Sequence, residues 1–141
     1  MYIKQVTTKE EKQLLIGWYN SINWKGMQEE LFPETSYIVY DGDTPVASSY
    51  FSMERSSPCA FLGITISNPE YKEDKTEYVD CLLDAVMNEM KREGCKIAYY
   101  YTDIHSEKFL NKYMIPRGFR FEKGFSGAVA LDSNYDPDFI I

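Results

Sequence analysis

Near the middle of the chain, the pattern of apolar and polar positions changes from that of a strand to that of a helix. Residues Phe61 to Ile66 form a short apolar run that is typical of a buried strand. Asn68-Pro69 ends this run, because proline has a fixed φ and no amide hydrogen for a β-ladder. The helix pattern that follows places one apolar stripe on a single face, made of Val79, Leu82, Leu83, Val86, Met87 and Met90.

The boundaries of this helix are also encoded locally. Asp74 and Glu77 have the spacing of an N-cap and its reciprocal partner, and Gly94 follows the stripe as a helix end. The next apolar run, Ile97 to Tyr101, predicts another strand. A strand, helix and strand of this length predict a parallel pair of strands joined by a right-handed crossover.

The N-terminal part predicts a strand followed by two helices. Tyr2 to Val6 alternates weakly, and Thr8 with Glu11 forms a capping box. A second, shorter helix is expected over Trp24 to Leu31. The first helix is expected to present one apolar face, made of Leu14, Leu15, Trp18, Tyr19 and Ile22.

A β-hairpin is predicted next. Ser36 to Tyr40 and Val46 to Met53 read as strands, and Asp41-Gly42 begins a turn that suits a hairpin. The strand at Phe61 to Ile66 is then expected to run antiparallel to its neighbour.

The C-terminal part predicts one helix and two strands. The helix spans Ser106 to Met114 and is expected to stop at Pro116 and Gly118. The strands are Phe119 to Phe121 and Ala128 to Leu131. The fold class is therefore α/β (α+β), with a single mixed, mostly antiparallel sheet of about seven strands and helices on both faces. Residues 1–131 are expected to form one domain, and residues 132–141 an acidic and then apolar tail.

The composition of the chain narrows the possible classes of function. The 141 residues are 44% hydrophobic and 16% aromatic, as expected of a folded domain. A net charge of −7 with no basic patch argues against nucleic-acid binding. No apolar run approaches the roughly 18 residues of a membrane span. The three cysteines lack metal-ligand spacing, and we expect no metal site, reduced thiols and a cytoplasmic location.

The order of elements, together with two short motifs, resembles the GNAT N-acetyltransferase superfamily. The motifs are Asn68-Pro69-Glu70-Tyr71, after the fourth strand, and Arg117-Gly118-Phe119, after the last helix. The resemblance covers about Tyr2 to Leu131 and is greatest to small phage-encoded members, for which the location would be the host cytoplasm. It implies that acetyl-CoA binds where the fourth and fifth strands separate, and that an amine attacks the thioester directly.

The resemblance also implies cofactor-binding residues. The pantetheine arm would pair with the backbone of Ile64, Thr65, Ile66 and Ser67. The diphosphate would lie on the following loop and helix N-terminus, where Lys72, Lys75 and the Thr76 hydroxyl are candidate ligands. This loop departs from the family pattern, because it contains no glycine and because four acids (70, 73, 74 and 77) outnumber its two lysines.

Candidate catalytic residues come from three places. Many family members carry a tyrosine in the last helix that protonates the departing thiolate. Here Leu110 stands at that position, and Tyr113, one helical turn further on, could replace it. For a general base the candidates are Glu54 and His105, the only histidine of the chain. The simpler alternatives are a core role for Tyr113 and a solvated loop position for His105.

Two functions remain open at this point. The first is an acyl-CoA-dependent N-acetyltransferase that modifies a cationic amine or protein acceptor, as a monomer or homodimer. The second is a non-catalytic GNAT-like phage accessory or virion-associated binding protein with a degenerate CoA site, favoured by the loop without glycine, by Leu110 and by the tail Asp136 to Ile141. A nucleic-acid modifier of the same fold would need a basic face, which the sequence lacks.

Overall fold

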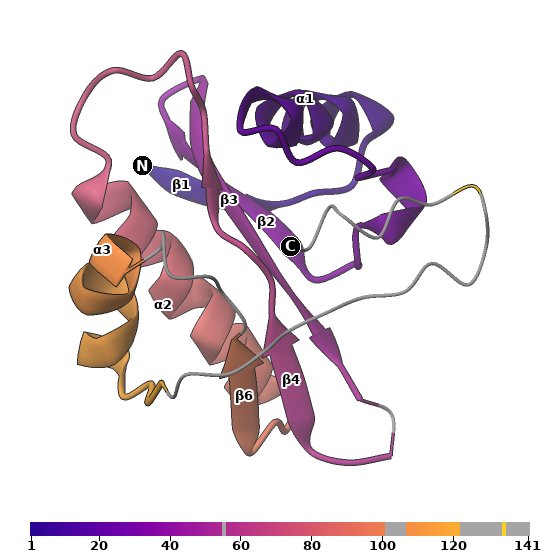
Figure 1. The fold of residues 1–141 in the computed structure, drawn as a ribbon, viewed down its shortest axis with the longest axis vertical. Helices are drawn as coiled ribbons and strands as arrows, with labels where there is room; N and C mark the ends of the chain where they lie inside the picture. Colours follow the sequence, from indigo (N-terminus) through magenta and orange to yellow (C-terminus); the bar gives the residue numbers. More distant parts are fainter. Residues whose placement is uncertain (55, 101–106, 122–133, 135–141) are drawn as a thin grey trace.

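The computed structural model describes residues 1–54, 56–100, 107–121 and 134, and they form one sheet with helices on both faces (Figure 1). The strands are β1 (Tyr2–Gln5), β2 (Ser36–Asp41), β3 (Thr44–Met53), β4 (Cys59–Leu62), β5 (Ile66–Ser67) and β6 (Ile97–Tyr100). The helices are α1 (Lys9–Ser21), η1 (Glu29–Leu31), α2 (Thr76–Arg92), α3 (Glu107–Phe109), η3 (Leu110–Met114) and η4 (Ile115–Arg117).

The sheet is mostly antiparallel, with the order β1-β2-β3-β4-β6. β2 and β3 form a hairpin whose last pair is Asp41 and Thr44, as the Asp41-Gly42 signal predicted. β4 and β6 are parallel, with Cys59 opposite Ile97 and Leu62 opposite Tyr100. The predicted parallel pair of strands joined through α2 is therefore confirmed, as is the fold class.

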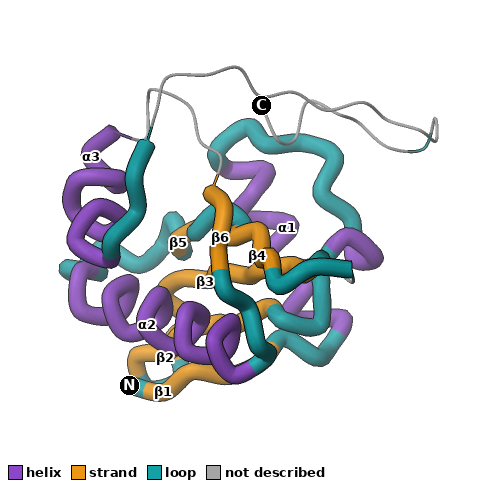
Figure 2. The backbone as a smooth tube through the Cα atoms, turned by 90° about the horizontal axis from the view of Figure 1, so that it is seen from below, coloured by secondary structure: helices purple, strands orange, loops and turns teal. Residues whose placement is uncertain are grey.

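Each face of the sheet carries its own core. α2 and α3 lie together on one side and α1 lies on the other (Figures 1 and 2). The predicted stripe of α2 packs on the sheet, with Leu82, Leu83 and Val86 fully buried. On the opposite side, Leu15 and Trp18 of α1 pack against Ile38. The apolar period of each helix thus determines which side faces the strands.

The N-terminal capping box forms as predicted. The Thr8 hydroxyl accepts a hydrogen bond from the Glu11 amide at 3.1 Å, and Glu11 Oε1 accepts one from the Thr8 amide at 3.0 Å. Lys4 Nζ adds an ion pair to Glu11 at 2.9 Å, which ties α1 to β1. Two amides that a helix start leaves without a partner are satisfied in this way.

Three boundaries differ from the prediction. The expected helix over Trp24 to Leu31 is wrong except for η1, because Asn23 and Gly26 have positive φ and the chain turns there. The expected single strand Phe61 to Ile66 is divided into β4 and β5 by three residues. α2 begins at Thr76, one residue too late for an Asp74 and Glu77 capping box, so that expectation is also wrong.

The last helix differs as well. It continues through Pro116 and ends at Gly118, whose φ of 95° few other residues adopt. Phe119 to Phe121 was expected to be a strand, but it pairs with no strand in the described part of the chain, and its two phenylalanine rings stack at 6.1 Å. The expected strand Ala128 to Leu131, the tail from residue 132 and Ser106 fall on residues that are not described, Asn134 excepted.

Candidate active site

A cavity of about 170 Å³ lies between β5, the start of α2 and the last helix. Its lining combines a strand edge, one lysine and two aromatic rings, contributed by Thr65, Ile66, Ser67, Lys75, Val79, Phe109 and Tyr113. β4 pairs with β6, whereas among the described strands β5 pairs only with β3, through Ser67 opposite Ala47. Within the described ranges no strand pairs with the other edge of β5, and the cavity is lined by residues of this strand.

β4 and β5 are consecutive segments that both pair with β3, and the break between them begins at Gly63. Its amide donates to the Tyr50 carbonyl at 2.7 Å, and the Tyr50 ring occupies the space where a Cβ would stand. A Cβ at this position would stand 2.3 Å from the ring, so any larger residue requires the ring to move. On the other side, the Tyr19 hydroxyl lies 3.5 Å from the Ile64 carbonyl, and burial raises the pKa of Tyr19 well above its ordinary value. Two tyrosines thus hold the segment that joins β4 to β5.

Polar groups gather where α2 begins, next to the cavity. The Asp74 carboxylate accepts hydrogen bonds from the Thr76 amide at 2.9 Å and from its hydroxyl at 2.7 Å, and these bonds lower the pKa of Asp74. Lys75 Nζ donates to the Ser67 hydroxyl at 3.3 Å, and Lys112 Nζ donates to Thr76 Oγ1 at 2.7 Å. Two lysine side chains, one from the start of α2 and one from the last helix, therefore make hydrogen bonds next to this helix end.

One predicted lysine lies elsewhere. Lys72 Nζ donates to the Pro69 carbonyl at 2.7 Å, and Lys72 does not line the cavity. The amides of Glu77 and Tyr78 lie in the first turn of α2, where a helix provides no carbonyl for them. The Thr76 amide is occupied by Asp74, whereas these two point out of the helix end as donors for an anion.

The last helix forms the wall opposite β5. Tyr113 is 7% exposed, and its ring lies 4.9 Å from that of Phe109. Lys112 Nζ stands 5.3 Å from the centroid of the Tyr113 ring. Tyr113, predicted from the sequence, therefore lies on the same cavity as the predicted backbone of Thr65 to Ser67.

Neither candidate base is found on this cavity within the described part of the chain. Glu54 is exposed beyond the end of β3, where its carboxylate accepts from the Ser56 amide at 3.4 Å and from its hydroxyl at 3.1 Å. Its own amide donates to Cys59, at the start of β4, whereas the cavity lies beyond the other end of that strand. His105 lies outside the described residues. Both assignments stay predictions.

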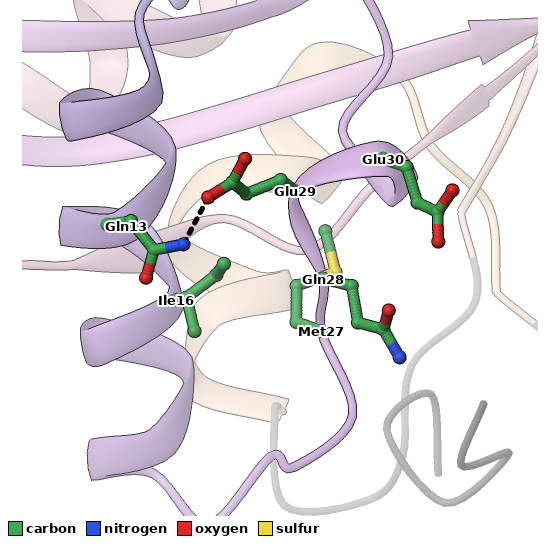
Figure 3. A pocket seen from close by; sticks show the side chains of 6 residues that line it. All are labelled: Gln13, Ile16, Met27, Gln28, Glu29 and Glu30. Carbon is green, nitrogen blue, oxygen red and sulfur yellow. Dashed lines mark hydrogen bonds between the residues drawn. The ribbon is translucent and has the colours of Figure 1, made fainter. Parts of the chain in front are cut away.

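A second hollow, of about 540 Å³, lies between α1 and η1. It is lined by Gln13, Ile16, Met27, Gln28, Glu29 and Glu30. Figure 3 shows Gln13 reaching across from α1 to bond the Glu29 carboxylate. None of the predicted site residues that the structure describes lines this hollow. Elsewhere in the described part, no helix is long and apolar enough to cross a bilayer, and no three His, Cys, Asp or Glu side chains converge as metal ligands.

No protein-family model and no curated protein matches this sequence. Solved structures do match the fold. The aminoglycoside N-acetyltransferase AAC(6')-Iy in complex with CoA has a TM-score of 0.63 at 17% identity, with 92% of this chain and 98% of that chain covered. The GNAT fold is therefore established for this chain.

Two further structures agree. An aminoglycoside acetyltransferase from an uncultured soil metagenomic sample, in complex with sisomicin, has a TM-score of 0.67 at 11% identity over 93% of this chain and 96% of its own. The ribosomal-protein-S18-alanine N-acetyltransferase from Escherichia coli has a TM-score of 0.63 at 11% identity, over 86% of this chain and 79% of that chain. At such identities the likeness concerns the fold. The expected similarity to phage-encoded members stays a prediction.

Sequence reasoning missed three residues of this site. Val79 and Phe109 line the cavity but belong to apolar helix faces, so the pattern marks them as core. Lys112 is 36 positions from Thr76 in the sequence, and only the packing of the last helix on α2 brings them together. The glycine inside the Phe61 to Ile66 strand pattern was the one local signal of the division between β4 and β5.

Proposed function

We propose that this protein is an acyl-CoA-dependent N-acetyltransferase that binds acetyl-CoA in the cavity between β5 and the last helix. The observation that carries the proposal is the edge of β5, which faces a cavity lined by five of the predicted site residues: Thr65, Ile66, Ser67, Lys75 and Tyr113. The amide groups of a pantetheine arm can pair with such an edge as an additional strand would.

The residues around the cavity suit the two ends of the cofactor. The α2 N-terminus offers the Glu77 and Tyr78 amides to the diphosphate, and Lys75 and Lys112 supply positive charge. The apolar Val79 and Phe109 also line the cavity and would contact the apolar part of the arm. In this proposal, Lys75 at the start of α2 and Lys112 in the last helix take the place of the glycine-rich phosphate loop of the family.

Acetyl-CoA supplies a thioester as the acetyl donor. In the transfer, the amine nitrogen bonds to the acetyl carbon, the carbon–sulfur bond breaks, and the amine gives up a proton to a base, for which His105 is the proposed group, since Glu54 lies at the far end of β4 from the cavity. Tyr113 is the proposed acid, because its side chain lines the cavity and can give a proton to the departing sulfur. The net charge of −7 favours a cationic amine or protein acceptor by long-range attraction.

Two lysines of the same loop provide a matched test. Lys75 lines the cavity, whereas Lys72 bonds a carbonyl outside it. Calorimetry with acetyl-CoA should show one site, and Lys75→Gln should weaken binding about tenfold, the factor that corresponds to about 1.4 kcal/mol for one charge-assisted contact. Lys72→Gln should change the affinity less than about twofold. Equal losses in both variants, or no heat at millimolar acetyl-CoA, would contradict the proposal.

A second function is favoured by one contact. Asp74 already occupies the Thr76 amide and places a negative charge where a phosphate would lie, as expected of a GNAT-like binding protein that has lost its cofactor. The two functions differ in a thermal unfolding experiment. A ligand that binds only the native state stabilises it by about 2.7 kcal/mol at one hundred times its Kd. An unchanged midpoint at millimolar acetyl-CoA would favour the binding protein.

A further inference from the structure

Arg117 is nearly buried although it stands at the end of the last helix. Its side chain is 13% exposed. Nη1 donates to Asp80 Oδ1 at 3.1 Å and to the Tyr113 carbonyl at 2.9 Å. Nη2 donates to the Asp80 carbonyl at 2.9 Å, and Nε donates to Asp84 Oδ1 at 3.1 Å. One guanidinium therefore joins two turns of α2 to the backbone of a residue that lines the cavity.

The helix that carries Tyr113 is unusual at this point. Leu110 to Met114 form a π turn, in which the Ile115 amide donates to the Leu110 carbonyl, five residues earlier. Pro116 accounts for it, because a proline ring collides with the carbonyl four residues earlier, here that of Lys112, and a wider turn relieves the collision. A π turn is less regular than an α-helix, so its orientation depends on external contacts.

We propose that Arg117 is a positioning residue that fixes this π turn against α2 and so directs the Tyr113 side chain into the cavity. The inference rests on the proposed function for its catalytic consequence, but not for its structural part. Because the guanidinium bonds the Tyr113 carbonyl, a shift of Arg117 moves the backbone from which the tyrosine ring projects. The position of the ring relative to β5 follows from that backbone.

The chemistry of the contact requires arginine. The guanidinium has five N–H donors in a rigid plane, and four acceptor atoms surround it here: two carboxylate oxygens and two carbonyls. A lysine ammonium keeps the charge but cannot reach acceptors spread over two turns of α2. Asp80 and Asp84 are four residues apart on one helix face and repel each other unless a cation lies between them. The pair on α2 is thus matched to this arginine.

Arg117→Lys tests the proposal, with Arg92→Lys as the matched control, since Arg92 pairs with Glu89 on the exposed side of α2. We expect Arg117→Lys to bind acetyl-CoA within about threefold of the parent, because β5 and Lys75 are intact, and to lower kcat at least tenfold. Tyr113→Phe should lower kcat as well, and adding Arg117→Lys to it should cause no further loss. Losses that multiply would show a role independent of Tyr113 and overturn the proposal.

A second readout separates this inference from the proposed function. In protein that contains 3-fluorotyrosine, the fluorine resonance of Tyr113, assigned with Tyr113→Phe, should move in Arg117→Lys and not in Arg92→Lys. If the protein neither binds nor uses acetyl-CoA, this shift still supports the positioning role. An unmoved resonance overturns it whatever the activity. Should Arg117→Lys fail to fold, Asp84→Asn removes one acceptor charge at a more exposed position, and the same resonance should move by a smaller amount.

Discussion

The contact between Gly63 and Tyr50 gives the sharpest prediction, because it divides one apolar run into two strands. A Cβ at position 63 would meet three ring atoms of Tyr50 at 2.3, 2.3 and 2.5 Å, whereas ordinary contacts are 3.4–4 Å. The ring would have to withdraw by about 1 Å from a packed position, and overpacking of this kind costs about 1–3 kcal/mol. The backbone of Gly63 has no positive φ, so the ring is the whole obstacle. Gly63→Ala should therefore destabilise the fold by that amount.

A double-mutant cycle isolates the cause. In a Tyr50→Ala background the three nearest obstacles are gone, so Gly63→Ala should cost less than about 0.5 kcal/mol there. Gly17→Ala is the control, because Gly17 is exposed within α1 and a Cβ there meets nothing within 4 Å. Alanine should stabilise that helix by about 0.5–1 kcal/mol. The free energy of unfolding is read from urea titrations at constant m value. A cost for Gly63→Ala that persists without the Tyr50 ring would show that the ring is not the obstacle.

Two further predictions concern charged groups at helix starts. Burial raises the pKa of Glu11, but hydrogen bonds from Lys4 and from nearby backbone amides lower it to about 2 from an ordinary 4.5. Glu11→Gln should therefore lower the free energy of unfolding by about 1–2 kcal/mol at pH 7. The difference between parent and variant should shrink as the pH falls from about 4.5 towards 2, because the carboxylate of the parent is then protonated. A difference that is unchanged at pH 2.5 in urea titrations would contradict this. Asp74→Asn should tighten coenzyme A binding by about three- to tenfold, since it removes a negative charge from the helix end that is proposed to receive the diphosphate. Glu73→Gln should change the affinity measured by calorimetry less, and equal effects would point to overall charge alone.

Most of the scaffold follows from local patterns. The α2 stripe has a helical period, and every predicted strand up to Met53 is present. The second N-terminal helix was wrong because Asn23 and Gly26 take positive φ, while buried Met27 packs on α1 from an irregular segment. Burial of apolar residues alone does not distinguish a short helix from such a segment.

The cavity itself needed tertiary information. The division between β4 and β5 depends on a ring thirteen positions away from Gly63, and the Lys112 contact joins the last helix to α2. The family resemblance indicated Thr65, Ser67 and Lys75, and these residues lie together on the cavity. The sequence could not indicate that Lys72 turns away from it, because the loop has no repeating pattern that fixes side-chain direction.

The edge of β5 and the start of α2 are the proposed binding site for coenzyme A. The most direct measurement is a titration of ¹⁵N-labelled protein with coenzyme A, followed residue by residue at the backbone amides. We expect saturable shifts for Thr65, Ile66 and Ser67 together with Glu77 and Tyr78, all described by one Kd. Amides at these five positions that stay unmoved at millimolar coenzyme A would contradict the claim.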